Sequence, residues 1–460
     1  MGDPLQVASS EASLRSRHAA EVERLLPGYQ TPITWLQAEL DEQRTVGLRA
    51  LLGSAIERSE WHRSRLGGVD VESVAAADIG ALPVMTKSDL MDNFDVVVSD
   101  RRLTRDRCED HLERSSGEYL LGEFQVVASG GSSGQRGVFV YGWNEWAICY
   151  ASNVRFSVRD WNEDPTLAGV RRIIAVVAAS SPTHISAALS KTFSTGANAR
   201  HLFPVSLPLG EIVSGLNVLQ PTVLMGYSSF LPRLAHEARA GRLRIAPRRI
   251  IAISEPLLSE SRRLLEEVWR APVANGYAMS EGMFTGFCGR SIHLPDDLCI
   301  VELVDADGRP VPPGEVSHRI LVTNLYNHTQ PLIRYDVTDQ LAVIGGDCRC
   351  GSHFTRIDDP QGRLDDVFVY RNGVTVHPHV FRSALGAEAA IIEYQVRQTA
   401  TGARVAIVST DHTDVTSLEN KIREALVKVG LIHPDVSIDV VPELLRQPSG
   451  KLKRFIPIVA

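Results

Sequence analysis

The chain has 460 residues, 44% of them hydrophobic and 22% charged, and its 48 basic and 55 acidic side chains give a formal net charge of −7. One hydrophobic core seldom fills a soluble chain of this length, so we expect two or more domains. The mild charge argues against nucleic acid or an anionic membrane surface as a partner.

The N-terminal quarter has the pattern of helices. Residues 14–26 and 45–58 carry apolar side chains near helical spacing with charges between them. Thr86 is expected to be the N-cap of a further helix, with Asp89 three residues on in the matching capping position. No segment is apolar for long enough to span a bilayer, and no signal-peptide core opens the chain, so we expect a cytoplasmic protein.

From residue 170 onward, apolar strands alternate with amphipathic helices. This alternation predicts a mainly parallel sheet covered by helices. The expected strands are 172–177, 222–227 and 249–253, and the expected helices are 186–193, 231–239 and 259–269.

The remainder of the chain reads as two further parts. Hairpin-like strands are expected at 300–304 and 319–323. A short α+β part follows from residue 370, with strands 405–409 and 436–440 around a helix over 417–429. Gly362 and a run of charge place the boundary near residues 361–366.

A glycine- and serine-rich segment, residues 129–137, lies between two apolar strand-like runs. Its four glycines free the backbone, so that N–H groups and serine hydroxyls can converge on an anion. Arg136 adds a charge suited to phosphate. A Walker loop opens a helix and ends in Gly-Lys, whereas this segment precedes a strand, so we interpret it as a phosphate loop within a hairpin. A plain flexible loop is the alternative.

Four cysteine and histidine residues have metal-ligand spacing. Cys288 and His293 form a Cys-x₄-His pair, and Cys348 and Cys350 form a Cys-x-Cys pair. Thiolates and imidazole suit a tetrahedral structural zinc ion, and clustered cysteines in a cytosolic chain indicate metal more than disulfides. Unpaired thiols are the alternative, and Cys299 could compete as a ligand.

Six motifs in order make the chain similar to the phenylacetate–CoA ligase group of adenylate-forming enzymes, within the acyl/aryl-CoA synthetase superfamily. The similarity covers roughly residues 60 to 455. The motifs occupy residues 82–87, 129–137, 277–281, 331–339, 362–366 and 448–451. The resemblance implies an α/β fold in which a large N-terminal adenylation domain (1–362) and a small mobile α+β domain (367–460) flank a hinge at 363–366.

The resemblance also implies a two-step reaction. A carboxylic acid attacks the α-phosphate of ATP, which gives an acyl-adenylate and pyrophosphate, and a nucleophile, usually the thiol of CoA, then displaces AMP. The implied cofactors are ATP, Mg²⁺ and CoA, and some members of the group also have zinc at the cysteine positions. The residues implied in nucleotide binding are Ser129, Gly130, Gly131, Ser132, Ser133, Gly134, Arg136, Tyr277, Ser280, Asp339 and Arg363.

Individual roles follow by the same resemblance. Glu281 would bind Mg²⁺ together with phosphate oxygens, Tyr277 would stack on adenine, and Asp339 would accept hydrogen bonds from the ribose hydroxyls. Asp365 would be the hinge. The chain departs from the group at Gln135, where lysine is usual, and the neighbouring Arg136 should project differently.

Lys451 is the principal catalytic candidate, beside Glu281 and Arg363. It lies in a Ser-Gly-Lys turn near the end of the chain. An ammonium group there would offset the repulsion between carboxylate and ATP and stabilise the charge that develops in transfer. A solvated basic tail is the alternative.

The acid pocket is the least specified part of the site. His184 follows an expected strand at a position where these enzymes often have a residue that gates the acid. Further candidates for the pocket wall are Tyr141, Trp143, Tyr227 and Ser228. Aromatic residues beside apolar runs are usually core residues, which is the alternative here.

The resulting hypothesis is an ATP- and Mg²⁺-dependent acid–thiol ligase that forms an aryl- or arylacetyl-CoA. The adenylate could instead pass to an acyl carrier protein, an amine or another nucleophile. A nucleotide-binding protein that has lost catalysis is a further alternative, suggested by Gln135. The identity of the small-molecule acid and the oligomeric state, including a homodimer, are left open.

Overall fold

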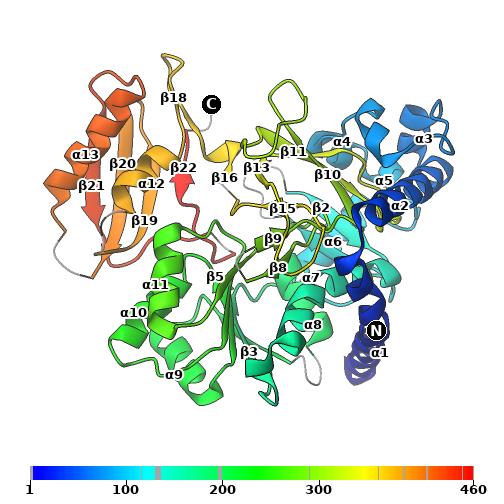
Figure 1. The fold of residues 1–460 in the computed structure, drawn as a ribbon, viewed down its shortest axis with the longest axis horizontal. Coiled ribbons are helices and arrows are strands. Elements are labelled where there is room, and N and C mark those ends of the chain that lie inside the picture. The colour runs from blue at the N-terminus through cyan, green and yellow to red at the C-terminus, as the bar shows by residue number, and fades with distance from the viewer. Residues whose placement is uncertain are drawn as a thin grey trace.

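The computed structural model describes residues 4–114, 117–129, 136–194, 199–289, 291–360, 362–386, 388, 390–410, 413–447 and 449–458, and side chains of helix α1 from residue 11 on. The chain forms a large body, and the last elements form a smaller lobe beside it (Figure 1). Within these ranges no helix is long and apolar enough to cross a bilayer.

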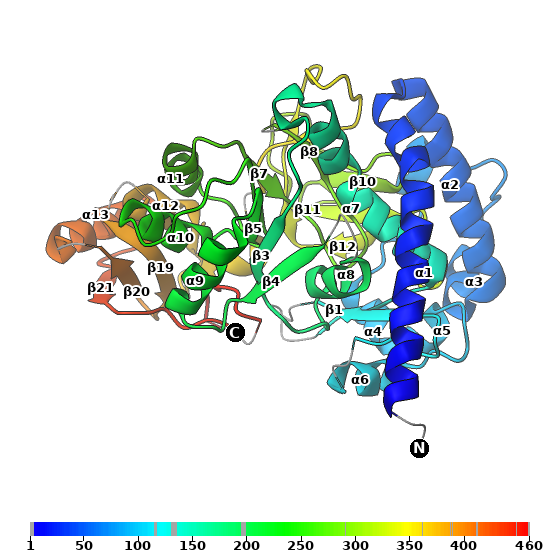
Figure 2. The same ribbon diagram turned by 90° about the horizontal axis from the view of Figure 1, so that it is seen from below.

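Helices form the N-terminal part of the large body, as the apolar spacing predicts. Figure 2 shows α1 alongside α7 and α8, so the first helix closes one side of the body. Thr86 caps α4 with the predicted partner, because its hydroxyl accepts from the Asp89 N–H and the Asp89 side chain accepts from the Thr86 N–H. The helices are α1 (Pro4–Gln30), α2 (Gln37–Arg58), α3 (Glu60–Leu66), α4 (Lys87–Asp92), α5 (Phe94–Val97) and α6 (Arg105–Glu113).

The predicted parallel sheet is present, with strand order β4-β3-β5-β6-β7. Helices α7 and α8 lie on one face, and α9, α10 and α11 on the other (Figures 1 and 2). The strands are β3 (Ile174–Ala178), β4 (Arg200–Pro204), β5 (Val223–Tyr227), β6 (Arg249–Ile253) and β7 (Val273–Gly276). The helices are α7 (Trp143–Glu163), α8 (Ile185–Phe193), α9 (Leu209–Leu219), α10 (Leu231–Arg239) and α11 (Ser259–Trp269).

Antiparallel strands flank this sheet. The glycine-rich segment does connect an antiparallel pair, because β1 and β2 are paired from Gln125–Tyr141 to Ala128–Val138. Three small sheets, ordered β10-β11-β12, β14-β15-β9-β8 and β13-β16, complete the body. The strands are β1 (Gln125–Ala128), β2 (Val138–Tyr141), β8 (Gly286–Cys288), β9 (Ser291–His293), β10 (Cys299–Val304), β11 (Arg319–Asn324), β12 (Tyr335–Val337), β13 (Asp339–Gln340), β14 (Val343–Ile344), β15 (Arg356–Ile357) and β16 (Gly362–Arg363).

The C-terminal lobe has the predicted α+β character and a core of its own. Its sheet has the order β21-β20-β19-β22, and buried side chains such as Phe381, Ile422 and Phe455 pack within it. The last strand, β22, pairs with β19, which returns the chain towards the large body. The elements are β17 (Phe368–Val369), β18 (Thr375–Val376), α12 (His379–Leu385), β19 (Ile391–Gln398), β20 (Gly402–Ser409), α13 (Val415–Lys428), β21 (Asp435–Val440) and β22 (Phe455–Ile456).

A buried histidine ties the N-terminal helices to the segment before β12. His62 is 1% exposed, and its Nε2 lies 3.0 Å from the carbonyl oxygen of Pro331, so the ring donates there. Burial lowers the pKa of His62 to about 4, because the charged form would lose its hydration. The neutral ring is therefore part of the folded structure.

We expect His62→Gln to reduce the loss of unfolding free energy that accompanies a decrease in pH. Between pH 6.5 and about 4 the unfolded chain protonates His62 and the folded chain does not. The free energy of unfolding therefore falls with decreasing pH by about 1.4 kcal/mol per pH unit from this residue alone. Urea unfolding across that window should show a slope smaller by this amount in the variant. The same change at exposed His379 should leave the slope unaltered, and an unaltered slope in His62→Gln would contradict the assignment.

Candidate active site

A cavity of about 550 Å³ lies where the carboxyl ends of the parallel strands meet the C-terminal lobe. This edge of a parallel sheet is where ligands of α/β proteins usually bind. Residues from all six sequence motifs line the cavity. The structure thus brings Glu281, Asp339, Arg363 and Lys451 to one place, although more than 160 residues separate the first from the last.

Asp339 connects two other polar side chains of the cavity through hydrogen bonds. It is 4% exposed and accepts a hydrogen bond from the Tyr277 hydroxyl and another from Arg363 Nε, each at 2.6 Å. The pairing of β13 with β16 sets Asp339 opposite Arg363, and the charge of Asp339 raises the pKa of that guanidinium. A carboxylate has about four acceptor positions, so Asp339 retains capacity for ligand hydroxyls.

A tight turn positions Glu281. Gly282 has φ +95°, and a Cβ there would lie 2.2 Å from Asn324 Nδ2, so only glycine fits. The amide of Asn324 donates to the Glu281 carbonyl at 3.0 Å, and the hydroxyl of Tyr326 donates to the Gly282 carbonyl at 2.6 Å. Burial raises the pKa of the Glu281 carboxyl, against the opposing charge of Arg363. A cation bound beside Glu281 would restore its charged form.

Three residues of this site have no role assigned from the sequence. Asn324 and Tyr326 hold the Glu281 turn from β11 and the segment after it, and they have no sequence signal of their own. Lys87 lines the cavity from the first turn of α4, where burial lowers its pKa and the nearby Glu281 opposes that effect. It belongs to the motif at residues 82–87, which the N-cap of Thr86 also explains.

Lys451 lies in a turn that is docked on the large body. The Leu452 N–H donates to Glu255 Oε1 at 2.7 Å, and the Tyr227 hydroxyl donates to the Ser449 carbonyl at 3.1 Å. Gly450 has φ +75°, and a Cβ there would lie 2.2 Å from Val205 Cγ2. Burial, together with the charge of Arg363, lowers the pKa of the Lys451 ammonium. Hydrogen bonds to the large body therefore hold the backbone on both sides of Lys451.

Only the ends of the glycine-rich loop are described. Two hydrogen bonds between Ser129 and Gly137 close the hairpin. The Ser129 N–H donates to the Gly137 carbonyl at 2.9 Å, and the Gly137 N–H donates to the Ser129 hydroxyl at 2.9 Å. Ser129 lines the cavity and Arg136 is exposed. The other expected members of the loop lie outside the described residues; they are Gly130, Gly131, Ser132, Ser133, Gly134 and Gln135.

The expectations for the acid pocket need correction. His184 lines the cavity, where burial and the charges of Lys451 and Arg136 lower its pKa to about 4. Tyr141, Tyr227 and Ser228 do not line it, because each is buried behind the wall and bonded to the backbone there.

These three side chains support the site from outside. The Tyr141 hydroxyl donates to the Ser280 carbonyl at 2.5 Å, and the Ser228 hydroxyl donates to the Glu255 carbonyl at 2.8 Å. Tyr227 holds the tail turn, as described above. Trp143 stacks on His18 instead, with ring centroids 4.0 Å apart.

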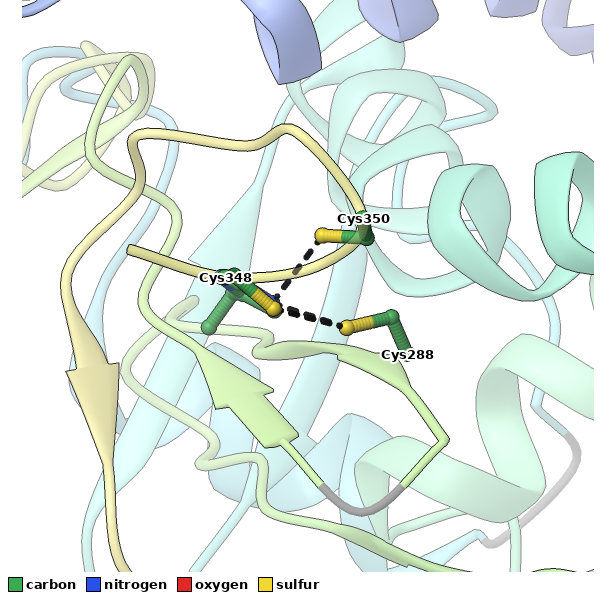
Figure 3. A group of neighbouring side chains, drawn as sticks. Cys288, Cys348 and Cys350 are labelled. Carbon is green, nitrogen blue, oxygen red and sulfur yellow. Dashed lines mark hydrogen bonds between the residues drawn. The ribbon is translucent and has the colours of Figure 1, made fainter. Parts of the chain in front are cut away.

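The predicted metal ligands form a compact group. Cys288 Sγ lies 3.2 Å from His293 Nε2 and 3.3 Å from Cys348 Sγ, and Cys350 Sγ lies 3.6 Å from the same nitrogen. The ligand atoms of all four lie within 4.8 Å of one another, and Figure 3 shows the three sulfur atoms pointing inwards. This set could hold a tetrahedral metal ion. Cys299, the suggested competitor, is fully buried outside the group.

No family model matches the chain, and no curated protein matches its sequence. Solved structures do match. The chain is similar to 2-hydroxyisobutyryl-CoA ligase in the postadenylation state with R3-HIB-AMP, with 17% identity, 93% of this chain and 91% of that chain covered, and a TM-score of 0.71. It is also similar to ATP-bound MatB from Rhodopseudomonas palustris, with 17% identity, 71% of this chain and 65% of that chain covered, and a TM-score of 0.51. A third similar structure is the anthranilate CoA ligase AuaEII with anthranoyl-AMP, with 16% identity, 72% of this chain and 65% of that chain covered, and a TM-score of 0.50. The chain therefore has the fold of adenylate-forming CoA ligases.

The similarity differs between two structures of the same neighbour. Against 2-hydroxyisobutyryl-CoA ligase in the thioesterification state the TM-score is 0.58, compared with 0.71 for the postadenylation state, over the same 93% of this chain. The overall backbone of this chain is thus more similar to that of the postadenylation structure.

We expect Gly450→Ala to undock the tail turn, because the added Cβ would overlap Val205. Hydrogen exchange of the Leu452 amide, now bonded to Glu255, should rise roughly tenfold or more. Gly373→Ala is the matched control: its φ is +80° and nothing lies within 4 Å, so it carries the backbone strain of about 1 kcal/mol without the overlap. Adding Val205→Ala to Gly450→Ala should restore protection. Equal exchange in the two glycine variants would refute the docking.

Proposed function

We propose that the protein is an ATP-dependent carboxylic acid–CoA ligase that acts through an acyl-adenylate. The observation that carries the proposal is the convergence of Lys451 from the tail with Glu281, Asp339 and Arg363 in one cavity. A basic tail that was merely solvated would not form the hydrogen bonds that join the Lys451 turn to Glu255 and Tyr227.

In the first half-reaction, the side chains divide the work between binding and charge stabilisation. Asp339 accepts from the ribose hydroxyls, and Tyr277, anchored to it, presents its ring to the adenine. Lys451 and Arg363 are positioned to stabilise charge on the α-phosphate and the attacking carboxylate, which otherwise repel each other. His184 is neutral, so it can border the acid without adding charge.

Mg²⁺ fits the carboxylate of Glu281. This group is buried, its pKa is raised by that burial, and a hard cation with phosphate oxygens as further ligands would compensate its charge. Bound there, the ion would neutralise the leaving pyrophosphate. The described ends of the glycine-rich loop, Ser129 and Arg136, would hold the same phosphates together with the rest of the loop.

For the second half-reaction we propose that residues 367–460 turn about a hinge at 363–366, relative to the domain of residues 1–362. Asp365, which accepts from the Thr338 hydroxyl at 3.3 Å, would be the hinge residue. The turn would break the hydrogen bonds at Ser449 and Leu452 and withdraw Lys451, so that the thiol of CoA can reach the adenylate. A carrier protein, an amine or another nucleophile would use the same opening.

The acid is proposed to have an apolar body, with an aryl or arylacetic acid as the class that the sequence resemblance favours. The cavity continues from His184 along the sheet face beneath α7 and α8. Its walls there are mostly apolar, and include Ile174, Val176, Leu189, Met225 and Ile251.

Lys451→Ala should reduce acid-dependent exchange of pyrophosphate into ATP by roughly a hundredfold or more, because it removes the charge that stabilises the transition state. The variant should still convert supplied acyl-AMP and CoA to the thioester. Lys428→Ala, at an exposed position in α13, is the control and should exchange normally. Near-normal exchange in Lys451→Ala would refute the assignment, and nucleotide binding without any exchange in the parent protein would favour a binder that has lost catalysis.

We also propose that Cys288, His293, Cys348 and Cys350 hold a structural zinc ion. Protein purified without chelators should contain about one zinc per chain, and Cys288→Ala should lose the metal and melt several degrees lower. Cys108→Ala, which changes a buried thiol outside the group, should keep the zinc. Zinc content near zero in the parent protein would leave four unpaired thiol and imidazole groups and overturn this proposal.

A further inference from the structure

Two arginines line the cavity at the end remote from Lys451. Arg172 stands two residues before β3, and Arg200 opens β4, where it pairs in register with Ile174. Both therefore lie at the amino ends of the parallel strands, whereas His184 and the Lys451 turn lie at the carboxyl ends. The cavity runs from one edge of the sheet to the other.

Neither arginine has an anionic partner in the described part of the chain. Arg172 Nη2 donates to the Ser157 hydroxyl at 3.2 Å, and Arg200 Nη1 donates to the Ser190 hydroxyl at 3.4 Å. The Nε of each is buried without a hydrogen-bond partner. A guanidinium has five N–H donors, so most of the donors of both groups remain available.

The nearby carboxylates are already engaged. Asp160 and Asp164, at the end of α7, are both paired with Arg249. Arg172 instead lies close to Arg200. Burial of Arg172, and next the positive charge of Arg200, lower the pKa of the Arg172 guanidinium to about 10. Two like charges held together in a recess are unfavourable unless an anion joins them. An anion that binds both guanidinium groups would relieve this repulsion.

Apolar side chains separate this cationic pair from the reacting end. The sheet face between them presents Ile174, Val176, Val223, Met225 and Ile251. β3 alone, from Ile174 to Ala178, spans about 13 Å at roughly 3.3 Å per residue. A ligand that fills the cavity would thus need an apolar body of comparable length with a charged group at each end.

We propose that the acid substrate carries a second anionic group, remote from the carboxyl that is adenylated, and that Arg172 and Arg200 bind it. A dicarboxylic acid with an apolar spacer is the substrate class that fits, because arginine forms paired hydrogen bonds to carboxylate. The inference rests on the proposed ligase function and narrows the acid within it. It also explains why cations stand at both ends of the apolar stretch of the cavity.

The test compares acids that differ only in the remote group. AMP release with ATP and CoA is measured for biphenyl-4,4′-dicarboxylic acid against 4′-methylbiphenyl-4-carboxylic acid, and for the α,ω-diacids from suberic to dodecanedioic acid against the corresponding monoacids. We expect at least one diacid to be preferred over its monoacid in kcat/KM. In Arg172→Met and Arg200→Met the KM for that diacid should rise roughly ten- to a hundredfold with kcat little changed, since charged hydrogen bonds are lost. Arg171→Met, at the exposed neighbour, is the control.

Two outcomes would overturn the inference. One is that every monoacid is used as well as its diacid. The other is that the arginine variants raise the KM for ATP or CoA and not that for the acid, which would assign the pair to a phosphate of a co-substrate. Calorimetric binding of the preferred diacid to the protein without ATP should be lost in Arg172→Met and kept in Arg171→Met. Because Lys451→Ala tests adenylation separately, failure of the ligase function and failure of the diacid site give different results.

Discussion

The site depends on the hydrogen bonds that hold a turn of the C-terminal tail against the large body. Glu255 is central, because its two carboxylate oxygens accept from the backbone N–H groups of Leu452 and Ser229, which belong to different lobes. Tyr227 adds a second link through the Ser449 carbonyl. Without these contacts the cavity would lose the ammonium group of Lys451 and would open to solvent on that side.

Charge in the cavity is arranged along its length. The carboxylates of Glu281 and Asp339 lie among Lys87, Arg363 and Lys451 at one end. The guanidinium groups of Arg172 and Arg200 lie at the other end, where none of the described carboxylates lines the cavity. The first end can balance a polyanion and a metal ion, since it contains both signs. The second can balance only an anion. The charges at the two ends of the cavity, with an apolar stretch between them, together specify the kind of group that each end can bind. No single residue does so alone.

Local patterns predicted much of the fold. The strand Arg249–Ile253 and the helices Leu231–Arg239 and Ser259–Trp269 have the predicted bounds, because their apolar periodicity is a property of consecutive residues. The motifs also named the residues that meet in the cavity. The sequence could not show that Tyr227 faces the tail rather than the ligand, nor that Arg172 and Arg200 share a recess, since both facts depend on strand register and on the packing of the lobes.

The cysteine and histidine group has a consequence for the rigidity of the large body around the cavity. It joins the hairpin that follows the Glu281 turn to the loop between β14 and β15, just beyond Asp339. A metal ion bound by these four side chains would fasten the two segments to each other and not to the C-terminal lobe. Any displacement of that lobe would then leave the hairpin and the loop in place beside the cavity.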